Sequence, residues 1–313
     1  MMIPIRSRYF RMSLTSRCNM ACIFCHNEGQ GPINNRSLSY LDAASITWIS
    51  KIAFNAGFRK FKLTGGEPLT RPDIFEIIRG IRSVGIQDLS MITNGVNLSR
   101  MAYSLRDAGL QRINVSLHSL DPLRFRTEFG SQPSLISKIV NGIDQAISVG
   151  FTDMKINCVY GGPHPEHDLD TMLDFTSHRS LTLVLLPELA FGAAKHNKEV
   201  SLDDLYEILK RKKIKKEELI VDGEGLRKRF ITMHNGAHVL LRLDELRGKF
   251  PYPACSNCQK ISICREGIFP VRLTAKGNLR PCLADGLPEV NLSHIIETQD
   301  EESLLQEFKN LGK

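Results

Sequence analysis

Short stretches rich in β-branched and aromatic residues alternate with longer stretches of helical periodicity over the first two thirds of the chain. The β-rich stretches are 9–15, 60–64, 89–93, 112–117, 154–159 and 181–187. Helix-like stretches such as 40–57 and 134–150 lie between them and end at a glycine. Repeated strand-then-helix units predict an α/β fold with a parallel sheet, either open or closed into a barrel.

Polar side chains share one face of several of these strands. Counting alternate residues places Arg11, Lys60, Lys62 and Lys155 on that face, while the opposite face is apolar. A sheet covered by helices on both faces should instead be apolar almost throughout. The pattern therefore favours a partial TIM-type barrel whose lumen holds a polar ligand. The alternative is a mixed sheet with half-exposed strands.

The strand-helix alternation stops at about residue 222, where the sequence becomes irregular and rich in proline. We expect two domains, a barrel core over residues 1–221 and a smaller, irregular, metal-stapled domain over residues 222–313. The lysine-rich stretch 209–219 supplies much of the formal charge of +7. We interpret it as a solvated helix face or a linker, and no nucleic-acid partner is expected.

Seven of the eight cysteines fall into two groups. Thiols stay reduced in the cytosol, so clustered cysteines there usually bind metal or take part in catalysis. No stretch approaches the roughly eighteen apolar residues of a membrane span, so a cytoplasmic location without a membrane partner is expected. The isolated Cys158 shares its strand face with Met154 and Ile156, which predicts a buried core thiol.

The first group is Cys18, Cys22 and Cys25, at C-x3-C-x2-C spacing. Structural zinc normally takes four ligands, and His26 is a poor fourth because it directly follows Cys25. A [4Fe–4S] cluster takes one thiolate per iron, so three cysteines leave one iron open to an external ligand. The spacing therefore favours a cluster with an open coordination position.

This loop, placed after a first strand and with Phe24 before its last cysteine, resembles the signature of the radical S-adenosylmethionine (SAM) superfamily. The resemblance implies a partial (β/α)6 barrel and a [4Fe–4S] cluster on the three cysteines, whose open iron binds SAM. It further implies cleavage of SAM to a 5′-deoxyadenosyl radical, which takes a hydrogen atom from the substrate. A flavodoxin- or ferredoxin-type partner is expected to supply the electron.

Later motifs extend the resemblance. "LTGGEPLTR" (63–71) is similar to the GGE motif of the superfamily, in which Gly65 and Gly66 allow a close backbone approach and Glu67 would accept hydrogen bonds from the SAM ammonium. Two further strand ends, "MITNG" (91–95) and "INVSLHSLD" (113–121), imply polar contacts to the SAM ribose and carboxylate. The residues implied there are Thr93, Asn94 and Ser116, which strand-end capping would explain nearly as well. No role is assigned to His118.

The second group of cysteines has C-x2-C-x5-C-x17-C spacing and consists of Cys255, Cys258, Cys264 and Cys282. By itself this spacing also suits a zinc ribbon. Beside a radical SAM core, it favours a second [4Fe–4S] cluster. The stretch "RLTAKGNLRPCL" resembles the GTP 3′,8-cyclases of molybdenum cofactor biosynthesis, in which three cysteines hold a second cluster that contacts the GTP base.

Departures from the cyclase pattern leave alternatives open. Cys264 is an additional cysteine, and of a substrate-binding arginine pair only Arg272 remains. The predicted function is a two-cluster radical SAM enzyme that rearranges or cyclises a phosphorylated, nucleotide-like substrate. The substrate-binding residues expected are Arg11, Lys60, Lys62, Lys155 and Arg272. The alternatives are a maturase that modifies a ribosomal peptide, since C-x2-C-x5-C also resembles its auxiliary domain, and a zinc-stapled binding module without enzymatic activity.

Overall fold

The computed structural model describes residues 9–30, 40–160, 166–187, 201–221, 227–242, 270–283 and 289–310. Cys255, Cys258 and Cys264 lie outside them. No helix in these ranges has both the length and the apolar character needed to cross a membrane.

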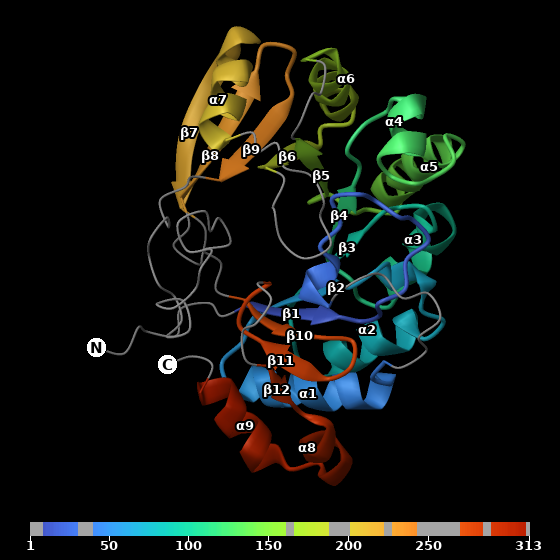
Figure 1. The fold of residues 1–313 in the computed structure, drawn as a ribbon, viewed down its shortest axis with the longest axis vertical. Helices are drawn as coiled ribbons and strands as arrows, with labels where there is room; N and C mark the ends of the chain where they lie inside the picture. The colour runs from blue at the N-terminus through green and yellow to red at the C-terminus, as the bar shows by residue number, and fades with distance from the viewer. Residues whose placement is uncertain are drawn as a thin grey trace.

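Six parallel strands form the centre of the sheet and follow one another in chain order (Figure 1). They are β1 (Tyr9–Ser13), β2 (Lys60–Thr64), β3 (Asp88–Thr93), β4 (Arg112–Ser116), β5 (Lys155–Tyr160) and β6 (Thr182–Pro187). All six coincide with predicted strands to within two residues at either end. The predicted α/β fold with a parallel sheet is confirmed.

Helices connect these strands and cover the sheet. They are α1 (Ala43–Asn55), α2 (Ile74–Ser83), α3 (Leu98–Asp107), α4 (Pro122–Thr127), α5 (Leu135–Ser148) and α6 (Glu166–Ser177). The Asp42 side chain caps α1 by accepting a hydrogen bond from the Ser45 backbone amide. Together the six strands and these helices form the partial (β/α)6 barrel, and the two end strands of the described sheet, β12 and β7, are not neighbours.

Strands from the C-terminal third, which the sequence did not predict, extend both ends of this sheet (Figure 1). Beyond β6 lie β9 (His238–Arg242), β8 (Arg227–Met233) and β7 (Ile214–Val221), and beyond β1 lie β10 (Val271–Leu273), β11 (Asn278–Arg280) and β12 (Val290–Asn291). The remaining helices are α7 (Leu202–Arg211), α8 (Ser293–Thr298) and α9 (Glu301–Asn310). Two short 3₁₀ turns, η1 (Asn27–Gly29) and η2 (Pro68–Thr70), complete the described elements.

The lysine-rich stretch 209–219 is not a linker. Its first part ends α7, and its second part is edge strand β7, which pairs with β8 in an antiparallel hairpin. Charged side chains suit an edge strand because they hinder pairing with another chain. The predicted domain boundary after residue 221 falls between β7 and β8, the two paired strands of this hairpin. The division into two domains stays a prediction.

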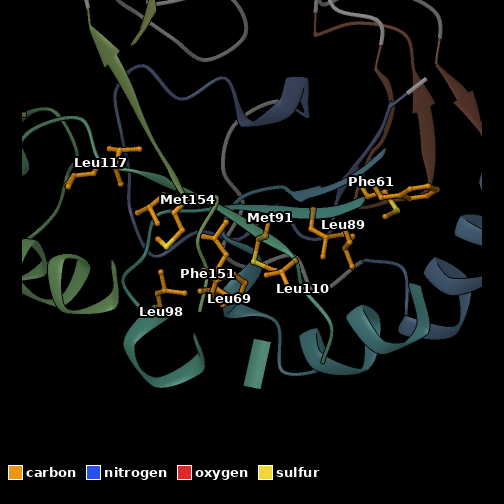
Figure 2. Close-up of a cluster of buried hydrophobic side chains, with 14 of the residues drawn as sticks. Phe61, Leu69, Leu89, Met91, Leu98, Leu110, Leu117, Phe151 and Met154 are labelled. Atoms are coloured by element: carbon orange, nitrogen blue, oxygen red, sulfur yellow. The ribbon is translucent and has the colours of Figure 1, made fainter. Parts of the chain in front are cut away.

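The apolar face of the sheet packs against the helices, as strand parity predicted. Phe10, Met12, Phe61 and Leu63 are almost fully buried there. Figure 2 shows part of this core, in which side chains from the strands lie between the sheet and the helices. Cys158 is 1% exposed and belongs to the same core, so its predicted burial is confirmed.

Candidate active site

The three-cysteine loop follows β1 and is held by the two residues directly after α4. The backbone amide of Ala21 donates to the carbonyl of Phe129 at 3.2 Å, and that of Ile23 donates to the carbonyl of Glu128 at 2.9 Å. Inside the loop, the amide of Cys25 donates to the carbonyl of Cys22 at 3.1 Å. These hydrogen bonds fix the loop against a segment about a hundred residues later in the chain, which sequence spacing could not reveal.

The thiols of Cys18, Cys22 and Cys25 are half-buried. Burial raises the pKa of the Cys22 thiol, and the neighbouring Cys25 and Cys18 reinforce the effect, so the sulfurs lie near one another. Among the described residues, no group of three or more His, Cys, Asp or Glu side chains is arranged to hold a single metal ion. A [4Fe–4S] cluster binds each thiolate at a different iron and does not require the sulfurs to converge on one point. The donor set therefore fits such a cluster.

The GGE segment lies against the backbone that leads into this loop. The Gly66 amide donates to the Thr15 carbonyl at 2.6 Å, and the Glu67 amide donates to the Arg17 carbonyl at 2.7 Å. A Cβ atom on Gly66 would lie 2.0 Å from the Arg17 carbonyl oxygen. The predicted close backbone approach is present, and its partner in this structure is the segment just before Cys18.

Glu67 connects the end of β2 to the end of β3. Its carboxylate accepts hydrogen bonds from the Thr93 hydroxyl at 2.7 Å and from the backbone amides of Asn94 at 2.7 Å and Leu69 at 3.0 Å. Burial raises the pKa of this carboxyl, and the three hydrogen bonds oppose that rise. A carboxylate has roughly four acceptor sites, so Glu67 has room to accept a further hydrogen bond from SAM. That contact stays a prediction.

Glu28 is a buried residue of this site that sequence reasoning missed. It accepts hydrogen bonds from both Nε and Nη2 of Arg11 and, at 3.0 Å, from the hydroxyl of Thr64. The Arg272 guanidinium lies 3.9 Å away. Burial disfavours the charged carboxylate, but the Arg11 charge, with smaller contributions from His26 and Arg272, outweighs it and lowers the pKa of Glu28 to about 2.

Only three of the five predicted substrate-binding cations lie side by side on neighbouring strands. Strand register places Arg272, Arg11 and Lys62 in one row across β10, β1 and β2. The Lys62 ammonium also lies 5.4 Å from the centre of the Tyr9 ring. By contrast, Lys155 lies on β5, where its ammonium is 3.5 Å from Asp153. Lys60 pairs in register with Tyr9 and Asp88, at the start of β2.

Ser116 ends β4, and His118 follows two residues later. Ser116 is half-buried and pairs in register with Asn157 of β5. The ring of His118 lies edge-on to Phe24 of the cysteine loop, with centroids 4.8 Å apart, and its Nδ1 accepts a hydrogen bond from the Val159 amide at 2.9 Å. Burial, reinforced by the charge of Arg124, lowers the pKa of His118 to about 3. His118 is therefore a neutral support for the loop, a role that its position in the sequence did not indicate.

Cys282 is the one member of the second group inside the described residues. It follows β11 and is half-buried. Strand β10, which belongs to the same C-terminal segment, pairs with β1 and so places this segment beside the strand that leads into the cysteine loop. The predicted joint ligation by all four cysteines stays a prediction.

Comparison with known proteins agrees with this site. Residues 12–176 match the family model of the radical SAM superfamily. The chain belongs to the radical SAM superfamily and is a radical SAM enzyme, with SAM and an iron–sulfur cluster as cofactors.

Within that superfamily, the chain is homologous to GTP 3′,8-cyclases. It is 33% identical to a probable GTP 3′,8-cyclase of Sulfurisphaera tokodaii, an alignment that covers 91% of this chain and 84% of the relative. It is also 31% identical to molybdenum cofactor biosynthesis protein 1 of Bos taurus, covering 95% of this chain and 45% of that protein.

Among solved structures, Streptococcus suis SuiB bound to the precursor peptide SuiA matches with a TM-score of 0.66 at 16% identity. The match covers 96% of this chain and 66% of SuiB, so the chain spans slightly less than two thirds of that protein. At this identity the likeness shows the fold alone.

Proposed function

We propose that this protein is a radical SAM enzyme that cyclises a purine nucleoside triphosphate, with GTP as the first substrate to test. The main support for this proposal is that homology to GTP 3′,8-cyclases extends over about nine tenths of the chain. It continues beyond the barrel and into the segment of the second cysteine group. A match confined to the barrel would support only the general chemistry of the superfamily.

The row formed by Arg272, Arg11 and Lys62 supports a phosphorylated substrate. Arginine and lysine are suited to bind phosphate oxygens through charge-assisted hydrogen bonds. Glu28 offsets part of the charge of Arg11 and Arg272, so the need for an external anion is smaller than the bare sequence suggested. We place the phosphate contacts at Lys62, which shares a register row with Arg11 and Arg272, with Lys60 and Lys155 as further contacts.

The chain's own residues would prepare the site as follows. Cys18, Cys22 and Cys25 would hold the first [4Fe–4S] cluster, which when bound supplies the electron for cleavage of SAM. Glu67 fixes the ends of β2 and β3 around the loop through three hydrogen bonds. The polar face of the parallel strands would hold the substrate, and a flavodoxin- or ferredoxin-type protein would reduce the cluster. The clustered cysteines and this need for a reductant support a cytoplasmic location.

We further propose a second [4Fe–4S] cluster on Cys255, Cys258, Cys264 and Cys282. Four thiolates would leave no iron open, so its role would be electron transfer or structural support, and direct contact with the GTP base would be lost. The pairing of β10 with β1 supports a position of this segment near the barrel opening.

The test is an anaerobic reaction of the reconstituted protein with SAM, dithionite and GTP, analysed by mass spectrometry. We expect GTP-dependent formation of 5′-deoxyadenosine together with a new guanine-containing product. ATP is the matched control nucleotide, and a variant with Cys18, Cys22 and Cys25 all changed to Ala is the control for the radical chemistry. If SAM cleavage is equal with and without GTP and no GTP is consumed, the proposal is wrong. A short precursor peptide consumed in place of GTP would identify the enzyme as a peptide maturase.

A further inference from the structure

The side chain of Asn94, directly after β3, has a fixed orientation. Its Oδ1 accepts a hydrogen bond from the Val96 backbone amide at 3.1 Å, and its own backbone amide donates to Glu67 at 2.7 Å. Because the oxygen is committed to the backbone amide of its own turn, the opposite end of the side chain must present the NH2 group. The carboxamide therefore acts as a donor toward the cysteine loop.

That NH2 group contacts two residues of the loop. Nδ2 of Asn94 donates to Oδ1 of Asn19 at 2.7 Å and lies 3.8 Å from Sγ of Cys18. The Met20 backbone amide also donates to the Cys18 sulfur, at 3.4 Å. Among the three cysteines of the loop, and within the described residues, Cys18 is the one whose sulfur a side-chain amide approaches. The three thiols are thus not equivalent before any cluster is bound.

We propose that Asn94 tunes the SAM-binding cluster by donating an N–H···S hydrogen bond to the thiolate of Cys18. A hydrogen bond to a ligand sulfur stabilises the more negatively charged, reduced cluster and so raises its reduction potential. Asn94 is a positioning residue in this role because it acts on the cluster through Cys18. The inference rests on the assignment of the first cluster to the three-cysteine loop and is independent of the identity of the substrate.

The same contacts argue for Asn94 as a partner of the cluster rather than as a direct ligand of SAM. Both ends of the carboxamide are used, the oxygen by Val96 and the nitrogen by Asn19 and Cys18. A hydrogen bond from Nδ2 to an acceptor on SAM, such as its carboxylate, would have to replace one of these contacts. The two roles therefore predict different consequences when the side chain is changed.

The test compares the full-length reconstituted protein with its Asn94→Leu and Asn94→Asp variants in an anaerobic redox titration followed by EPR. The signal to follow is the one that shifts when SAM is added, since this identifies the cluster with the open iron. We expect the midpoint potential to become more negative in both variants, while SAM still shifts the signal. An unchanged potential combined with loss of the SAM-induced shift would overturn the proposal and make Asn94 a SAM contact.

Two further variants separate the hydrogen bond from its surroundings. Asn97→Asp is the matched control, because the Asn97 amide lies in the same turn but donates to the Leu69 carbonyl at 3.2 Å, so the potential should not change. Asn19→Ala removes the other partner of the Asn94 amide and leaves Cys18 in place. If Asn19→Ala lowers the potential as much as Asn94→Leu does, the effect comes from loop position and the proposed hydrogen bond is wrong.

A measurement on the wild-type protein does not depend on whether any variant assembles its cluster. Protein labelled with ¹⁵N in asparagine side-chain amides should show a weak ¹⁵N hyperfine coupling to the reduced, SAM-binding cluster in pulsed EPR. The Nδ2–Sγ contact of Asn94 predicts this coupling. Its absence in the wild-type protein would overturn the proposal, even if the protein cleaves SAM and converts GTP.

Discussion

The guanidinium of Arg11 donates two hydrogen bonds to the carboxylate of Glu28, which lies 17 residues later, beyond the cysteine loop. The same carboxylate also accepts a hydrogen bond from Thr64 of β2. Glu28 therefore links β1, β2 and the C-terminal end of the loop through one buried charge. An anion supplied by the protein itself sits where the sequence suggested only cations.

Glu28→Gln should destabilise the protein at neutral pH and remove part of its acid sensitivity. The pKa of Glu28 is lowered from 4.5 to about 2 in the folded protein, so the carboxylate contributes stability above pH 4.5. That contribution, roughly 3 kcal/mol, is lost as the pH falls from 4.5 toward 2. Urea unfolding of cluster-free protein between pH 7 and pH 3 measures it. The exposed Glu76→Gln is the control, and an equal pH dependence in both variants would contradict the assignment.

Gly66→Ala should displace the loop that carries Cys18. Its Cβ would lie 2.0 Å from the Arg17 carbonyl oxygen, so backbone must move, at a cost of about 1–3 kcal/mol. We expect less iron per protein after reconstitution and a lower melting temperature. Gly85→Ala is the matched control, because Gly85 has a φ of +99° but no atom within 4 Å of an added Cβ. Its melting temperature should fall while its iron content stays at the wild-type level.

His118→Leu should weaken the support of the cysteine loop more than His118→Gln does. Leucine leaves the Val159 amide without its acceptor, at a cost of about 1–3 kcal/mol, whereas a glutamine oxygen can replace Nδ1. Because the pKa of His118 is lowered from 6.5 to about 3, the neutral ring contributes stability above pH 6.5 that declines as the pH falls toward 3. Thermal unfolding at pH 7.5 and pH 5 checks both statements. Equal loss in the two variants would show that the hydrogen bond is unimportant.

Lys62→Ala should weaken GTP binding and spare SAM cleavage in the absence of GTP. Loss of one charge-assisted contact to a phosphate costs about 1–3 kcal/mol. Calorimetric titration of the SAM-loaded protein with GTP measures the affinity, and Lys51→Ala is the control because Lys51 is exposed and pairs with Glu301 on the surface. If Lys62→Ala abolishes SAM cleavage but binds GTP normally, this lysine serves the SAM site.

Changing Cys255, Cys258, Cys264 and Cys282 together to Ala should remove about half of the iron and leave the SAM-dependent EPR shift of the first cluster intact. If all four cysteines ligate the second cluster, GTP should not alter its signal in the wild-type protein. A GTP-dependent change in that signal would show an open iron and exclude Cys264 as a fourth ligand. Zinc in place of iron at this site would refute the second cluster altogether.

The sequence by itself determined the barrel and the chemistry of the loop. Strand parity is a local property with a period of two, so the six strands and their apolar face could be predicted from alternate residues such as Phe61 and Leu63. The spacing of Cys18, Cys22 and Cys25 likewise carries its meaning within eight residues. Features of this kind depend only on neighbours in the chain.

The tertiary structure alone decided which charges and donors meet. Glu28 reaches Arg11 and Arg272 only because β1 pairs with both β2 and β10, which lie more than two hundred residues apart in the chain. Similarly, Asn94 and His118 reach the cysteine loop only because the ends of neighbouring parallel strands lie at one edge of the sheet. A buried ion pair or a shared hydrogen bond depends on distances across the fold, and no local pattern of residues encodes those distances.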